Sequence, residues 1–125
     1  MVTGMLDLES LFKLNYPMCI ICSVHEGRIN GCIVNTVFQL TPEPPTVAFS
    51  LNKASLTHEL IRAGGRFAVS VLAEGAPLSL IKRFGFRSGR QGSKFEHVNY
   101  RLGANGSPII LENTASYIEI GRAHV

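Results

Sequence analysis

The sequence predicts one mainly β domain, a small barrel that carries two or three short helices. Segments rich in β-branched and aromatic residues follow one another without regular helical segments between them, which disfavours a doubly wound parallel sheet. The chain has 125 residues, 46% of them hydrophobic and 17% charged, which suits a single domain with its own core. This composition excludes a disordered chain, a coiled coil and a collagen repeat.

The first part of the chain predicts a helix followed by strands. Pro17 ends the entry helix, Glu26 and Gly27 form a turn between two strands, and Pro42 breaks the long strand before it. The expected helix and three strands lie at residues 5–13, 18–24, 29–40 and 46–51.

The second part predicts two helices and three further strands. Ser55 can cap the first helix and Gly64-Gly65 end it, while Pro77 opens the second and Gly85 closes it. A glycine-rich loop follows at residues 85–108. The strands are expected at residues 67–72, 108–111 and 115–120.

The cysteines and histidines do not form a recognisable redox or metal motif. Three cysteines are an odd number, which disfavours a secreted disulfide framework. Cys19 and Cys22 lie in a strand-like run, where residues three apart face opposite sides, so we expect buried structural thiols. No HExxH or second CxxC occurs, and no metal site is expected. With no expected signal peptide or membrane span, the sequence predicts a soluble cytoplasmic protein.

Half of the positive charge lies in one part of the chain. Six of the 12 Lys and Arg residues fall between residues 82 and 101, in a chain of net charge +3. The segment is either a solvated surface loop or a cationic lid over an anionic ligand.

Residues 50–57 bring many short polar side chains to the start of a predicted helix. The first turn of a helix has free N–H groups and the positive end of the dipole, and it therefore attracts phosphate. Ordinary capping by Ser55 is the alternative, and both interpretations remain open. The polar residues of this segment are Ser50, Asn52, Lys53, Ser55 and Thr57.

Polar residues also interrupt the preceding strand. Asn35, Thr36 and Gln39 indicate either a half-exposed edge strand or a rim that contacts a flat heterocycle. No carboxylate pair or framed nucleophile is present, so no catalytic side chain is expected, and any chemistry is expected to come from a cofactor.

Two long stretches resemble the flavin reductase-like family of FMN-binding split barrels. They read NGCIVNTVFQLTPEPPTVAFSLNKASLTHELI, and FGFRSGR followed by KFEHVNYRLGANGSPIILENTASYIE. The second is similar to the flavin reductase module of high-molecular-weight rubredoxins and related NAD(P)H:FMN oxidoreductases. The resemblance covers about residues 10–120.

This resemblance implies a homodimer in which non-covalently bound FMN accepts hydride from NAD(P)H and passes electrons to rubredoxin or another metalloprotein. An FMN-binding protein without turnover of its own is the alternative. Val34, Asn35, Thr36 and Gln39 would meet the ring or ribityl chain. Ser50, Asn52, Lys53, Ser55 and Thr57 would hold the phosphate end, and Phe84 and Gly85 would close over the cofactor.

Members of the family continue with further strands. The resemblance therefore implies that residues 1–119 form an incomplete barrel, truncated at the C-terminus. The last six residues, IGRAHV, look like one reading frame of a sequencing adapter, so residues 120–125 are expected to be a non-native tail. A basic β-barrel that binds nucleic acid is the rival class, supported by the cations of residues 82–101. Few aromatic residues alternate with these cations and no RNP pattern occurs, so nucleic acid is not expected as a partner.

Overall fold

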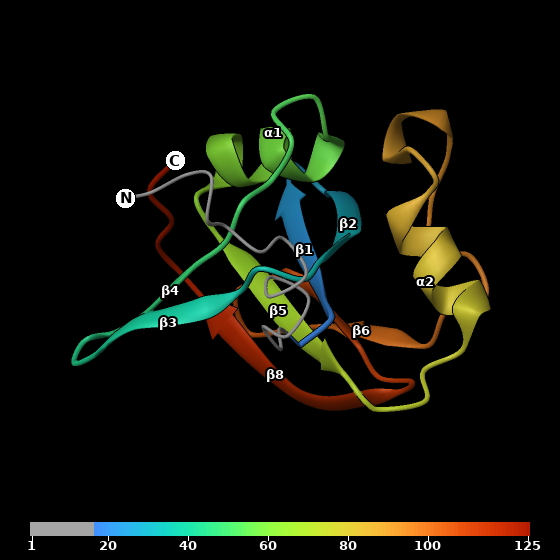
Figure 1. Ribbon diagram of the computed structural model, residues 1–125. Coiled ribbons are helices and arrows are strands. Elements are labelled where there is room, and N and C mark those ends of the chain that lie inside the picture. Colours follow the sequence, from blue (N-terminus) through green and yellow to red (C-terminus); the bar gives the residue numbers. More distant parts are fainter. Residues whose placement is uncertain (1–16) are drawn as a thin grey trace, which may run out of the picture.

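The computed structural model describes residues 17–125, and its centre is a four-stranded antiparallel sheet (Figure 1). The strand order is β2-β1-β5-β8. The bounds are Cys19–His25 for β1, Arg28–Val34 for β2, Phe67–Leu72 for β5 and Thr114–Ile120 for β8. The entry helix expected at residues 5–13 lies outside the described residues.

A two-residue turn sets the register of β1 against β2. His25 pairs with Arg28, and Glu26 and Gly27 between them both have positive φ, 50° and 77°. Such a turn matches the right-handed twist of antiparallel strands. The register that it sets continues to the pair of Cys19 with Val34.

The long strand expected at residues 29–40 is in fact two strands in different sheets. β2 ends at Val34, and the chain leaves the central sheet before β3 (Phe38–Pro42) pairs with β4 (Pro45–Ala48). Every residue of β3 is exposed, and the β3–β4 hairpin projects from the sheet (Figure 1). High β propensity continues through the segment, but propensity does not show where a strand changes its partner.

A third small sheet pairs β6 (Tyr100–Leu102) with β7 (Pro108–Ile110). β6 lies inside the segment expected to be a loop. The last two predicted strands are confirmed as β7 and β8, and β8 pairs with β5 as far as Ile120 opposite Phe67.

Both predicted helices are confirmed, with their ends close to the expected residues. α1 (Leu56–Gly64) begins after Ser55, whose side chain accepts a hydrogen bond from the His58 N–H. It ends at Gly65, which has φ 72° and donates its N–H to the Ile61 carbonyl at 2.7 Å. α2 (Leu78–Gly85) follows Pro77. A short 3-10 helix, η3 (Gly89–Gln91), comes next.

The alternation of side chains along β1 creates two cores, one on each face of the sheet. Cys19 and Ile21 join the core that α1 covers, whereas Ile20 and Cys22 join the core that α2 covers. The two cysteines therefore face opposite sides, as predicted. No helix within residues 17–125 is long and apolar enough to cross a membrane.

Candidate functional site

A cavity of about 410 Å³ opens between the start of α1 and the segment that follows α2. Its size falls within the range of roughly 300–1,000 Å³ that is typical of small-molecule sites. Three separate stretches line it: β2 with Asn30, Cys32, Ile33 and Val34; residues 50–56, except Lys53; and residues 84–89. The remaining lining residue is Lys94.

The wall at the start of α1 is folded by its own polar side chains. Asn52 Oδ1 accepts the Ala54 N–H at 2.9 Å, and Ser55 Oγ accepts the His58 N–H at 3.0 Å. These bonds occupy oxygen acceptors, so the Asn52 amide N–H₂ and the Ser55 hydroxyl keep their donors for a ligand. The positive end of the α1 dipole adds to this donor-rich wall.

Lys94 is one of the residues that line the cavity. Its side chain is buried, and Nζ donates to the Gly31 carbonyl at 2.8 Å and to the Phe84 carbonyl at 3.1 Å. Burial lowers the pKa of Lys94. The residue thereby ties β2 to the last turn of α2. In the sequence, Lys94 stood out only as one of the clustered cations. Its neighbour Phe95 is a buried core residue, and a lysine next to such an aromatic residue was the one indication that Lys94 could be buried as well.

The cavity has a positive character. Arg87 and Lys94 line it, and none of the described residues that line it is acidic. Two of the other clustered arginines make contacts elsewhere: Arg83 donates to the Glu96 carbonyl and Arg101 to the Tyr117 hydroxyl, both at 2.9 Å. The cluster therefore does not form one cationic lid, and only part of it faces the cavity.

Apolar groups form the rest of the cavity wall. Ile33 and Val34 come from β2, Leu51 from the opposite segment, and Phe84 and Phe86 from the end of α2. Phe86 is 78% exposed, which is unusual for so large an apolar side chain. A cavity that combines an apolar part with a donor-rich, positive end suits a flat apolar ring joined to an anionic group.

The structure brings only some of the predicted site residues together. Thr57 lies behind the wall, fully buried, and accepts a hydrogen bond from Asn30 Nδ2 at 3.0 Å. Gln39 donates to the Thr41 carbonyl on the projecting hairpin, and Thr36 accepts the Ser50 N–H at 3.5 Å. Asn35 follows β2 outside the cavity lining. Those that line the cavity are Val34, Ser50, Asn52, Ser55, Phe84 and Gly85.

Lys53 faces a second and larger cavity, of about 1,010 Å³. This cavity lies between β4, the segment after it and the residues that follow β8. Its wall is largely apolar, with Val47, Phe49 and Phe67 among the residues that form it.

The cysteines do not resemble a redox pair. Cys19 and Cys22 are fully buried, and burial raises the pKa of both thiols. Cys32 lines the first cavity, and burial raises the pKa of its thiol as well. No group of metal-ligating side chains occurs in residues 17–125.

Comparison with known proteins identifies the family. The model of the flavin reductase like domain matches residues 11–119. This chain belongs to that family. It is 48% identical over 114 residues to the high molecular weight rubredoxin of Moorella thermoacetica, and the match covers 91% of this chain and 50% of that protein. It is 40% identical over 114 residues to the ferric-chelate reductase (NAD(P)H) of Archaeoglobus fulgidus, and this match covers 91% of the chain and 68% of that protein.

Two solved structures have the same fold as this chain. Nitrilotriacetate monooxygenase component B from Mycobacterium thermoresistibile superposes with a TM-score of 0.76 at 32% identity, over 88% of this chain and 59% of that one. An FMN-binding protein from Thermus thermophilus superposes with a TM-score of 0.77 at 24% identity, over 89% of this chain and 61% of that one. The predicted family and fold class are confirmed. The chain spans about half the length of the rubredoxin relative.

Proposed function

We propose that this flavin reductase-like chain binds FMN in the first cavity and works as an NAD(P)H:flavin oxidoreductase. The observation that carries the proposal is that one cavity combines Arg87, Lys94 and the donors before α1 with the apolar side chains of β2 and α2. FMN has the complementary shape and charge, since its ring is flat and its phosphate is anionic. The names of the relatives, which include an NAD(P)H-dependent reductase and an NADH-dependent flavin reductase, support the same reaction class.

The residues present fit FMN well. Ser50, Asn52 and Ser55 offer donors at the start of α1, and Arg87 and Lys94 supply positive charge for a phosphate. Val34, Phe84 and Gly85 supply surface for the ring, and Asn35 and Thr36 adjoin it at the end of β2. Lys53, Thr57 and Gln39, also expected from the sequence to bind FMN, do not line the first cavity and carry no part of this fit.

FMN supplies the redox chemistry when bound: it accepts hydride from a nicotinamide and delivers electrons onward. The chain itself binds and orients the cofactor, and its apolar wall excludes water from the ring. Exposed Phe86 lies where the cavity meets solvent, and there it can contact a second planar ring. No side-chain acid or base is assigned a role.

The proposal extends to partners and location. We propose rubredoxin or another metalloprotein as the electron acceptor, because a high molecular weight rubredoxin is among the relatives. We also propose a cytoplasmic homodimer. Its support is the large apolar second cavity and the exposed Phe38 and Leu40 of the hairpin, surfaces that a second subunit could cover.

Titration with FMN followed by anaerobic mixing with NADH or NADPH tests the function. We expect FMN to bind with a shift of its visible absorbance, and the bound flavin to bleach when the nicotinamide is added. Binding without bleaching would favour the FMN-binding protein without turnover. A protein that leaves FMN unbound but carries nucleic acid through purification would contradict the proposal.

A further inference from the structure

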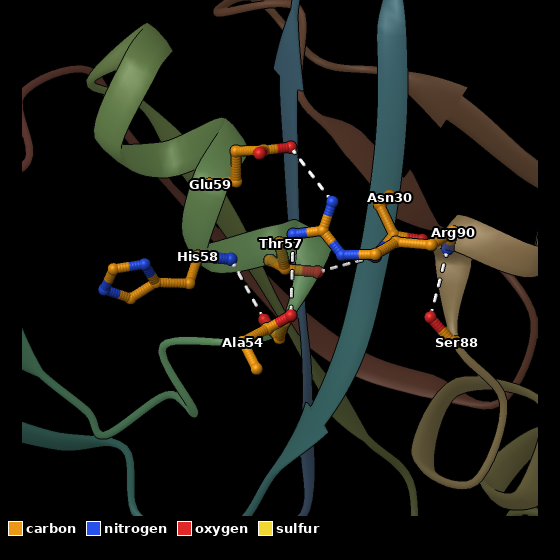
Figure 2. Close-up of polar contacts among 8 residues, drawn as sticks. Asn30, Ala54, Thr57, His58, Glu59, Ser88 and Arg90 are labelled. Carbon is orange, nitrogen blue, oxygen red and sulfur yellow. Dashed lines mark hydrogen bonds and ion pairs between the residues drawn. The ribbon is translucent and has the colours of Figure 1, made fainter.

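Two walls of the first cavity are joined on their outer side by the side chain of Arg90. This residue directly follows the wall of residues 84–89, but it does not line the cavity itself. Its Nη2 lies 3.5 Å from the Ala54 carbonyl oxygen in the opposite wall, and its Nη1 lies 3.5 Å from Glu59 Oε2 on α1. Figure 2 shows the side chain crossing β2 to reach α1. Arg90 therefore spans the gap between the walls where α1 begins.

Contacts on both sides of Arg90 fix the position from which its side chain starts. Its backbone N–H donates to Ser88 Oγ at 3.1 Å. Gly89 packs so closely against Asn30 that a Cβ atom at position 89 would collide with Asn30 Oδ1. Asn30 is buried and donates to Thr57 of α1 at 3.0 Å, so the 88–90 segment is held against both β2 and α1 (Figure 2).

We propose that Arg90 closes the α1 end of the cavity and thereby makes the site select a flavin mononucleotide over a flavin dinucleotide. This inference rests on the proposed FMN site. In the proposed binding pose, the phosphate of a mononucleotide would end beside the start of α1. The second phosphate and the adenosine of a dinucleotide would extend past Ala54, whose carbonyl oxygen lies 3.5 Å from Arg90 Nη2, and would meet the guanidinium there.

Cavity size and charge support the same selection. A volume of about 410 Å³ is near the lower end of the roughly 300–1,000 Å³ range of small-molecule sites, which favours the smaller ligand. Glu59 pairs with Arg90 on the outer side and is half-exposed. Its carboxylate neutralises the positive charge of the guanidinium, so the Arg90–Glu59 pair offers a second phosphate little net attraction.

The test compares the dissociation constants of FMN, FAD and riboflavin by calorimetry for the wild-type chain and three variants. Arg90→Ala removes the bridge, and Arg90→Ala with Glu59→Gln also removes the carboxylate charge that the first change leaves without its partner. Arg83→Ala is the matched control, because Arg83 lies in the same segment but contacts Glu96 instead of α1. Thermal melting without flavin confirms that each variant is folded.

We expect the wild-type chain to prefer FMN over FAD, and Arg90→Ala to reduce that preference about tenfold. The change should come from tighter FAD binding, with FMN affinity altered less than about threefold, because Arg90 does not line the cavity. The double variant should bind FAD more tightly still, and Arg83→Ala should match the wild type.

Different failures contradict different proposals. A wild-type chain that binds none of the three flavins contradicts the proposed function. A chain that binds FMN but prefers FAD, or whose preference survives Arg90→Ala, contradicts only the role of Arg90. Loss of FMN binding with riboflavin binding intact in Arg90→Ala would make Arg90 a phosphate ligand, and this too would overturn the inference.

Discussion

Lys94 carries a charged amine into a place that water hardly reaches: only 4% of the residue is exposed. Its two backbone acceptors, on Gly31 and Phe84, belong to β2 and α2. One side chain therefore both joins two elements and contributes charge to the cavity. At the residue scale, this double role makes Lys94 the most informative position to change.

Replacing Lys94 with Met should destabilise the fold measurably. The change keeps the apolar stem but leaves the Gly31 and Phe84 carbonyls without their donor, and a buried unsatisfied group costs about 1–3 kcal/mol. Urea unfolding measures the loss of unfolding free energy. Lys82→Met, at an exposed lysine of α2, is the control and should change stability little. Equal stabilities of the two variants would contradict the role assigned to the Lys94 hydrogen bonds.

The pH dependence of stability should also reflect the burial of Lys94. Its folded pKa lies below the ordinary value of 10.5, so between these two pKa values the unfolded chain binds more protons than the folded chain. The contribution of Lys94 to stability therefore rises with pH in this window and levels off above 10.5. The wild-type unfolding free energy minus that of Lys94→Met should show this rise in urea titrations. A difference that falls over the same window would reverse the assigned sign.

Arg87 and Lys53 are two candidate cations for the phosphate of FMN. Arg87 is suggested by the structure, and Lys53 was expected from the sequence. Arg87 lines the first cavity, whereas Lys53 lines the second. We expect Arg87→Ala to weaken FMN binding roughly ten- to a hundredfold, as for loss of a charge-assisted contact, and to leave riboflavin binding nearly unchanged. Lys53→Ala should have the smaller effect in the same titrations. The reverse order would favour the phosphate site predicted from the sequence.

At the scale of the elements, the sequence predicted those features that depend only on neighbouring residues, such as the ends of a helix. Ser55 and Gly65 mark the ends of α1 because a cap and a left-handed residue act within one turn. The strand expected at residues 29–40 was wrong in its extent, because β propensity continues from β2 into β3 and does not show where the chain leaves the central sheet to pair with β4. The roles of Arg87 and Lys94 were missed for a different reason: β2 and the residues before α1, which line the cavity with them, lie far away in sequence.

The two cysteines of β1 test whether that strand is purely structural. Changing Cys19 and Cys22 together to Ala should leave the rate of flavin reduction per folded molecule unchanged, because each thiol lies in a separate core. Stability should fall by roughly 0.5–3 kcal/mol through lost packing. Stopped-flow absorbance measures the reduction. A collapse of that rate with FMN still bound would show that the pair is redox-active.

At the scale of the whole molecule, the central sheet separates two cores, and the first cavity lies where α1, β2 and the segment after α2 meet. The sequence predicted the fold class and the family because the hydrophobic pattern and the motifs extend over most of the chain. It did not predict the shape of the cavity, which depends on how the three stretches pack together.

FMN should stabilise the whole domain. A ligand that binds only the folded state at about 100 times its dissociation constant adds about 2.7 kcal/mol to the unfolding free energy. We expect the melting temperature to rise with FMN concentration in thermal melts followed by light scattering. Riboflavin at the same concentration should give a smaller rise, because it lacks the phosphate. An unchanged melting temperature at saturating FMN would contradict binding at a folded site.

The assembly of the first cavity from three distant stretches has a consequence for how the protein is made. The β1–β2 hairpin, with its two-residue turn, can form as soon as residue 34 has left the ribosome, because its contacts are local. The cavity also includes Lys94. Its amine donates a hydrogen bond to the carbonyl of Gly31, which lies 63 residues earlier in the sequence. On the proposed FMN site, a nascent chain would therefore acquire flavin only after at least the first 94 residues have emerged, which would make flavin loading a late event of biosynthesis.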